Sequence, residues 1–310
     1  MNREEFEKEQ QADQLKIRNL YEGKKEEPCK SEWTIKVPGF AVETYNETLP
    51  SDIPGIDLQS DEVLPYFDWK MLFAIWGVKY GSAVPEAMEL MQLRRDAEEE
   101  LSLRNFKIKV SARFFKAQRE DNDIVLESGE RLPMMRQETG KMMSLCDYLP
   151  ERSTGKHSAF GVFSICVKAA DAHEEGCCCP ACSNKYEDLV AKAVRMTLAE
   201  ATSKWLDAKI LKEVSNVKVI KPAAGYSSCP DHTLKRDIFG LLPDEFNLGI
   251  KLTESCAMIP EASICGLIFM HPEAAYNEIR NISTSQYEDY TRRRGMSEEE
   301  ARRFLGHILK

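Results

Sequence analysis

An alternation of apolar and polar residues constrains the fold of this chain more than any other feature. From residue 106 to residue 114 every second side chain is apolar, and each intervening side chain is Lys, Ser or Arg. Successive side chains of a β-strand point to opposite faces of a sheet, so this pattern predicts a strand with one buried face and one wet face. The turn-forming run 120–123, followed by the apolar residues 124–126, predicts its hairpin partner.

Two further segments, residues 159–167 and 264–270, are mainly apolar on both faces, which is typical of central strands. Residues 251–259 and 262–270 flank Pro260 and Glu261, and we interpret them as a second hairpin. Antiparallel hairpins mixed with helices, without a regular strand–helix alternation, predict an α+β fold.

The longest predicted helix spans about residues 183–214, where apolar residues recur at helical spacing. Glu200 falls at the edge of this apolar stripe, so its carboxylate either extends into solvent or faces a partner. Near the start of the domain, Asp68 precedes an aromatic-rich run that begins at Trp69. As an N-cap, Asp68 can accept hydrogen bonds from the first free amides of a helix.

Composition excludes several classes of function. The hydrophobic fraction of 43% and the charged fraction of 30% are ordinary for a soluble globular protein. No run approaches the ~18 apolar residues of a transmembrane helix, so we expect no membrane partner. The formal net charge of −9 argues against a nucleic-acid partner, whose phosphates require Lys and Arg.

The first thirty residues are charged throughout and contain no apolar signal-peptide core. Ten Cys without an export signal indicate reduced thiols and a cytoplasmic protein. We expect residues 1–32 to form a charged leader, helical or frayed, which is either solvated or a docking arm. Residues 33–310 are expected to form one domain.

The segment Lys221–Tyr226 is the strongest functional signal. It reads Lys-Pro-Ala-Ala-Gly-Tyr and is followed by Cys-Pro-Asp-His-Thr at 229–233. A rigid Pro, a permissive Gly and a Tyr beside a cation suit a loop that a ligand approaches at backbone distance. Alone, the segment would be better interpreted as a turn between a helix and a hairpin. Related residues continue downstream at Lys251–Ser255, Ala257–Met258, Pro260, Ala262–Ser263, Gly266, His271–Pro272 and Tyr276.

This series of motifs resembles the S-adenosylmethionine-binding activation domain of cobalamin-dependent methionine synthase, over roughly residues 60–310. The resemblance implies a single crescent-shaped domain on a twisted antiparallel sheet with flanking helices. Two positions depart from the family pattern. Lys221 stands where the family has Arg, which replaces a planar bidentate fork with a point charge. Asn277 stands where the family often has a second Tyr, which affects the adenine contact.

The resemblance also implies a binding site without a catalytic side chain of its own. Lys221 would face the carboxylate of S-adenosylmethionine, and Asp68 would face its amino group. Glu200 matches an acidic family position. The complete implied set is Asp68, Glu200, Lys221, Pro222, Ala223, Gly225, Tyr226, Tyr276 and Asn277.

A cysteine-rich segment offers a different chemistry. Cys179 and Cys182 have the spacing of zinc or redox sites, and His173 and Cys177 complete a candidate ligand set. The alternative is a thiol-rich surface loop without metal. The run Asp171-x-His173-x-x-Gly176 matches a cobalt-ligating motif of corrinoid proteins, but that motif belongs to a separate domain, so we do not expect it to bind cobalt here.

The family resemblance implies a reactivation module that presents S-adenosylmethionine during reductive methylation of cob(II)alamin. We expect it to act in trans on a methionine synthase lacking its own activation domain, or on a related corrinoid methyltransferase. That partner would supply cobalamin, and a flavodoxin-like protein would supply the electron. The alternatives are a corrinoid-docking module that has lost methyl-donor binding, and a metal or redox protein centred on residues 177–182.

Overall fold

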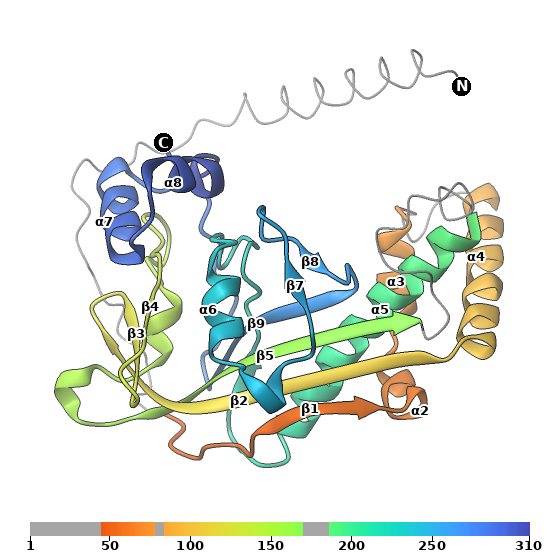
Figure 1. Ribbon diagram of the computed structural model, residues 1–310, viewed down its shortest axis with the longest axis horizontal. Coiled ribbons are helices and arrows are strands. Elements are labelled where there is room, and N and C mark those ends of the chain that lie inside the picture. The colour runs from red at the N-terminus through yellow and green to blue at the C-terminus, as the bar shows by residue number, and fades with distance from the viewer. Residues whose placement is uncertain (1–44, 78–83, 170–185) are drawn as a thin grey trace.

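The computed structural model describes residues 45–77, 84–169 and 186–310 (Figure 1). The strands are β1 (Ile53–Leu58), β2 (Phe106–Glu120), β3 (Asp123–Leu126), β4 (Arg131–Pro133), β5 (Ser158–Ala169), β6 (Lys218–Ile220), β7 (Lys251–Leu252), β8 (Met258–Ile259) and β9 (Ser263–His271). The α-helices are α2 (Ser60–Val63), α3 (Trp69–Ile75), α4 (Val84–Leu103), α5 (Tyr186–Ile210), α6 (Leu234–Gly240), α7 (Thr284–Arg294) and α8 (Glu298–Leu305).

An antiparallel sheet runs through the length of the molecule in the order β4-β3-β2-β5-β9-β6. Strand β1 pairs with β2 at 108–112, beyond the segment of β2 that pairs with β3. Helices α3 and α4 gather at one end of the sheet and α7 and α8 at the other (Figure 1). The predicted antiparallel α+β fold with flanking helices is confirmed.

The two faces of the sheet carry separate hydrophobic cores. Odd-numbered β5 residues such as Phe163 and Ile165 pack with α5, whereas even-numbered Phe160 and Val162 pack with α6. This division follows from the two-residue period of a strand. It places α5 on one face and α6 on the other, as Figure 1 shows. A third cluster joins α7 and α8 at the C-terminal end.

Strand β2 is longer than predicted, and its second face is not uniformly wet. The predicted hairpin is confirmed, because Glu120 pairs with Asp123 across a two-residue turn. However, Ser111 is fully buried, and its hydroxyl lies 2.9 Å from that of Ser164 on β5. The neighbouring Arg113 donates to the carbonyl of Leu241, just beyond α6. The elements covering the second core therefore also cover these polar positions.

The predicted hairpin of residues 251–259 and 262–270 is wrong. Strand β7 pairs with β8, and β9 pairs with β5 and β6 instead. The chain already reverses at residues 253–257, where the amide of Cys256 donates to the carbonyl of Thr253. Strand β9 is buried along nearly its whole length, so its place is in the central sheet rather than in a surface hairpin.

The Lys221–Tyr226 loop continues the edge strand β6. Strand β6 pairs with the end of β9, and Ala223 then pairs with Gly266 in the same register. Between them, the amide of Leu267 donates to the carbonyl of Pro222 at 3.0 Å. Pro222 has no amide hydrogen to offer, which an edge strand tolerates. The loop is thus seated on the sheet by backbone hydrogen bonds.

A fully buried ion pair holds the hairpin end of the sheet. The Arg136 guanidinium donates to both carboxylate oxygens of Asp147 at 2.6 Å, and its Nε donates to Asn122. The backbone amide of Arg136 donates to Gln286 on α7. Because both charges have lost their water, their stability depends on this mutual pairing.

Replacing Arg136 with Met should destabilise the protein by about 3–5 kcal/mol, because Asp147 would remain buried without its partner. Urea unfolding followed by circular dichroism measures this loss. The double variant Arg136→Met/Asp147→Leu removes both charges and should be more stable than the single variant. A single variant within about 1 kcal/mol of wild type would contradict the assigned role of the pair.

Replacing Gly266 with Ala should unseat the Lys221–Tyr226 loop. A Cβ at this position would lie 2.5 Å from the Pro222 carbonyl oxygen, which already accepts the Leu267 amide. We expect a loss of about 1–3 kcal/mol in the free energy of unfolding. Gly240→Ala is the matched control, since no atom lies within 4 Å of its added Cβ. Equal melting temperatures for the two variants would contradict this packing.

Candidate functional site

One face of α5 carries a row of alternating charges. Glu200, Lys204 and Asp207 are four and three residues apart, so they lie on successive turns of the same face. Glu200 and Asp207 are half-buried, whereas Lys204 is exposed. Asp68, before α3, contacts this row on one side, and Lys221, after β6, contacts it on another. The fold therefore brings three of the predicted site residues, Asp68, Glu200 and Lys221, to one helix face.

Lys221 is held against α5 by two acceptors. Its ammonium forms an ion pair with Asp207 and donates to the Ser203 carbonyl at 2.8 Å. Only 6% of the Lys221 side chain is exposed, compared with 34% for Asp207. Its backbone amide also donates to the Tyr276 hydroxyl at 2.9 Å. Lys221 is therefore fixed in both backbone and side chain.

Asp68 has two roles that the structure joins. One carboxylate oxygen accepts the Lys70 amide at 3.0 Å, which confirms the predicted N-cap of α3. The other oxygen accepts from the Lys204 ammonium at 2.8 Å. This hydrogen bond holds the pKa of Asp68 below its ordinary value. Asp68 therefore stays ionised and remains accessible to solvent.

Burial and neighbouring charges shift the pKa values along this row in opposite directions. Burial raises the pKa of Glu200, although the ammonium groups of Lys221 and Lys204 oppose the shift. Burial also raises the pKa of Asp207, against the attraction of Lys221. The pKa of Lys221 is lowered by burial, while Asp207 and Glu200 favour its charged form. Glu200 forms no ion pair with any residue that the structure describes, so its carboxylate is open to a cationic partner.

Two tyrosines flank the loop and remain accessible. Tyr226 is 69% exposed and Tyr276 is 60% exposed, and both rings present large faces to solvent. Tyr276 is tied to the loop through Lys221. In contrast, the Asn277 amide donates to the Tyr148 hydroxyl at 2.9 Å. Asn277 is thus half-buried with its amide bound to Tyr148, while the two tyrosines are exposed.

Gly225 allows the loop to turn sharply at its end. Its φ is +96°, and an added Cβ would lie 2.2 Å from the His232 ring. Its amide donates to the Cys229 carbonyl at 2.7 Å, which closes the turn. Pro222 is buried against β9, and Ala223 is half-buried. The Pro and Gly therefore shape the backbone, and Tyr226 projects from it.

A hollow of about 510 Å³ opens beside Asp68 and Lys204. Aromatic side chains line part of it, and the Arg94 guanidinium lies 4.8 Å from the ring centre of Trp69. This volume is within the range of small-molecule sites. The Lys221–Tyr226 loop does not contribute to its lining, so the hollow belongs to the Asp68 end of the charged row.

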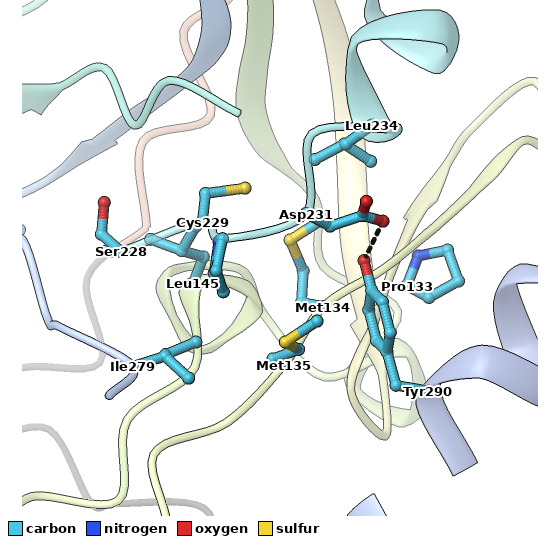
Figure 2. Close-up of a pocket in the computed structure, with 11 residues that line it drawn as sticks. Pro133, Met134, Met135, Leu145, Ser228, Cys229, Asp231, Leu234, Ile279 and Tyr290 are labelled. Carbon is cyan, nitrogen blue, oxygen red and sulfur yellow. Dashed lines mark hydrogen bonds between the residues drawn. The ribbon is translucent and has the colours of Figure 1, made fainter. Parts of the chain in front are cut away.

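Figure 2 shows a second concavity, on the opposite face of the sheet. Met134, Cys229 and Tyr290 are among its lining residues, and its volume is only about 10 Å³. The Tyr290 hydroxyl donates to Asp231 at 2.8 Å, as Figure 2 shows, and Arg294 pairs with the same carboxylate. Such a void has room for about one water molecule. It serves the packing of the 226–233 segment against α7 rather than ligand binding.

The cysteine-based candidates His173, Cys177, Cys179 and Cys182 lie outside the described residues. Within residues 45–77, 84–169 and 186–310, no group of three His, Cys, Asp or Glu side chains is arranged to hold a metal ion. Over the same part of the chain, no helix has the length and apolarity needed to cross a membrane.

Lys204 and Asp207 were missed by the sequence analysis. Their signal was present, because they follow Glu200 at the spacing that puts side chains on one helix face. Together with Asp68, Glu200 and Lys221 they form a set of acids and cations beside the exposed Tyr276, whose hydroxyl accepts the Lys221 amide. Such a set suits a ligand with both an ammonium and a carboxylate, attached to an aromatic group.

This chain is similar to a known protein family and to a solved structure. Residues 59–295 match the family model of the vitamin B12-dependent methionine synthase activation domain. The crystal structure of the MetH reactivation domain bound to AdoHcy is similar to this chain, with a TM-score of 0.75 and 28% sequence identity. The match covers 87% of this chain and 95% of that chain.

These findings confirm the resemblance drawn from the 221–226 motif and its downstream residues. The family match extends over most of the sequence and includes Asp68, Glu200 and the whole Lys221–Tyr226 loop. The chain therefore belongs to the family of vitamin B12-dependent methionine synthase activation domains.

Proposed function

We propose that this chain binds S-adenosylmethionine along the charged face of α5 and presents its methyl group to a cobalamin-carrying protein. The observation that carries the proposal is the convergence of Glu200, Lys221 and Tyr276 at one place, with Asp68 linked to them through Lys204. The AdoHcy bound by the similar MetH domain supports a ligand of this adenosyl class.

The donor set fits the chemistry of S-adenosylmethionine. Lys221 supplies the cation for the carboxylate, and Glu200 and Asp68 supply acids for the ammonium group. Because Glu200 has no ion-pair partner among the described residues, it can receive a positive charge without losing an existing pair. Tyr276 and Tyr226 offer aromatic faces for the adenosyl part and the sulfonium, contacts worth about 1 kcal/mol each.

The backbone of the loop completes this proposed site. Pro222 and Ala223 are fixed in register on β9, and Gly225 keeps the turn narrow. A ligand approaching this edge would meet a rigid backbone that has little conformational entropy left to lose. We therefore assign Pro222, Ala223 and Gly225 to the shape of the site rather than to charge recognition. Asn277 would act indirectly, through its hydrogen bond to Tyr148.

The role of the chain in the reaction is positioning. When bound, cobalamin supplied by the partner would provide the cobalt chemistry for methyl transfer. The residues of this chain would hold the sulfonium end of the donor toward that centre, which is a proximity effect. We include in the proposal action in trans on a corrinoid methyltransferase in the cytoplasm, with a flavodoxin-like protein as electron donor.

A corrinoid-docking module without methyl-donor binding is the second candidate. The observation that favours it is the ion pair between Lys221 and Asp207, which satisfies the cation internally. Lys221 also lacks the second parallel hydrogen bond that Arg offers a carboxylate. Direct ligand titration separates the two functions.

Isothermal titration calorimetry with S-adenosylmethionine should detect binding, and Lys221→Arg should tighten it. The guanidinium can bind a ligand carboxylate through two hydrogen bonds, so we expect a gain of about threefold to tenfold. Asp68→Ala should weaken binding, because one acid for the ammonium group is lost. Lys218→Arg, at an exposed position on β6, is the matched control and should change nothing.

Absence of heat and of thermal shift at millimolar S-adenosylmethionine would reject donor binding and favour the docking module. A spectroscopic assay addresses the partner. A corrinoid methyltransferase loaded with cob(II)alamin, a reductant and S-adenosylmethionine should regenerate methylcobalamin only when this chain is added. Equal regeneration without the chain would reject the reactivation role.

Binding should weaken on acidification at a higher pH than an ordinary Glu would produce. Burial raises the pKa of Glu200, so its carboxylate is neutralised early as the pH falls, and its attraction for the cationic ligand is lost. Glu200→Gln should bind S-adenosylmethionine weakly at neutral pH, and its affinity should no longer fall as the pH is lowered. Calorimetry between about pH 5 and pH 8 measures both effects.

Protonation of Glu200 would not weaken binding by unfolding the protein. Since the folded state has the higher pKa, it takes up the proton more readily than the unfolded state. Protonation of Glu200 therefore favours folding as the pH falls through the window between the two pKa values. If the affinity of Glu200→Gln for S-adenosylmethionine still falls at acidic pH as it does in the wild type, another group governs the pH dependence.

A further inference from the structure

Two of the three charged groups assigned to the amino-acid end of the ligand, Asp68 and Lys221, are already paired within the protein. Asp68 lies 2.8 Å from the Lys204 ammonium, and Lys221 is paired with Asp207. Each pair unites an expected ligand-binding residue with a residue of the opposite charge on α5. The two α5 residues therefore present an ammonium and a carboxylate to the same groups that the ligand would contact.

We propose that Lys204 and Asp207 form an internal substitute for the amino-acid end of S-adenosylmethionine, which the ligand must displace. This inference rests on the proposed function. Lys204 binds Asp68 in place of the ligand ammonium, and Asp207 binds Lys221 in place of the ligand carboxylate. Because they are three residues apart on one helix, the two charges are held next to each other.

Asp207 matters for ligand binding because residue 221 is Lys and not Arg. An ammonium has three donors, and on Lys221 the Asp207 carboxylate and the Ser203 carbonyl engage two of them. An Arg has five donors in a fixed fork and can serve two carboxylates at once. With Lys at this position only one donor is left, so a ligand carboxylate that takes more than a single hydrogen bond competes directly with Asp207. The substitution and the internal ion pair thus act together to weaken ligand binding.

The two internal pairs differ in how easily they separate. The Asp68 and Lys204 side chains are 40% and 50% exposed, so water screens their attraction and displacement costs little. Lys221 is 6% exposed, and its pair with Asp207 lies in a less polar environment. We therefore expect Asp207 to dominate the competition and Lys204 to contribute a smaller part.

The opposite role for Asp207 is that of a positioning residue, which orients the Lys221 ammonium toward the ligand. The two roles predict opposite changes in the affinity for S-adenosylmethionine when Asp207 loses its charge. If Asp207 competes with the ligand carboxylate, removing its charge tightens binding. If Asp207 orients Lys221, removing its charge weakens binding. General electrostatics also predicts weakening, since S-adenosylmethionine carries a net positive charge and Asp207 attracts it.

Calorimetry on the full chain tests the proposal with Asp207→Asn and Lys204→Met. Affinity for S-adenosylmethionine should rise about tenfold in Asp207→Asn and about threefold in Lys204→Met, consistent with a partly buried and an exposed pair. Glu187→Gln and Lys209→Met make the same charge changes elsewhere on α5 and should leave affinity unaltered. Melting curves establish that each variant is folded.

A second ligand isolates the carboxylate. Decarboxylated S-adenosylmethionine keeps the ammonium, the sulfonium and the adenosyl group, so Asp207→Asn should not tighten its binding. Equal tightening of both ligands would overturn the proposal, and so would weaker or unchanged binding of S-adenosylmethionine in Asp207→Asn. If that variant does not fold, Lys204→Met decides the test, because its exposed pair contributes little to stability.

The outcomes also separate this inference from the proposed function. Wild-type binding that Asp207→Asn fails to strengthen would overturn the internal substitute and leave donor binding in place. If the wild type does not bind S-adenosylmethionine but Asp207→Asn does, donor binding by the native chain is rejected, whereas competition between Asp207 and the ligand carboxylate is supported. If neither the wild type nor any variant binds S-adenosylmethionine, donor binding is rejected, and the internal substitute is rejected with it.

Discussion

The hydrogen bond from the Leu267 amide to the Pro222 carbonyl is the constraint on which the site depends. It keeps the Lys221–Tyr226 loop in the register of β6 on β9, where Gly266 has no side chain to hold the loop away. This placement directs the Lys221 side chain to the face of α5 that carries Asp207. Since β9 is a buried central strand, the loop inherits the rigidity of the sheet. The Lys221–Tyr226 loop is therefore an extension of the sheet edge.

Charge pairing on α5 follows from that placement. The helix packs on the sheet through its apolar residues, which leaves Glu200, Lys204 and Asp207 at the boundary between core and solvent. Partial burial raises the cost of every unpaired charge there. Asp68 and Lys221 meet this requirement by pairing with Lys204 and Asp207, whereas Glu200 remains without an ion pair among the described residues. This row therefore has internal partners for Asp68, Lys204, Asp207 and Lys221, and one acid without an ion pair among the described residues.

The sequence predicted β2, β3, β5 and β9 and Asp68 as a helix cap, because periodicity and capping are local properties. The short strands β1, β4 and β6 were not predicted. The prediction failed at the hairpin of residues 251–270, because strand partners depend on which face is buried and not on which strand comes next. The motif identified the loop and the family. The motif could not show that Lys221 is paired with Asp207, since that contact joins residues brought together only by the fold. Glu200, Lys204 and Asp207 stand at helical spacing, so the charged row was detectable, whereas its partners were not.

The Lys at position 221 is best understood together with its surroundings. A Lys in place of Arg would by itself suggest a weakened site, because a carboxylate loses one of two parallel hydrogen bonds. In this fold the ammonium is nearly buried and is held by Asp207 and the Ser203 carbonyl, so its position is fixed before any ligand arrives. A fixed cation avoids the entropy cost of ordering a long side chain on binding, but its internal partner must be displaced. On the proposed function, the affinity of the site would be set by the balance between these two effects, with Asp207 as the residue that adjusts it.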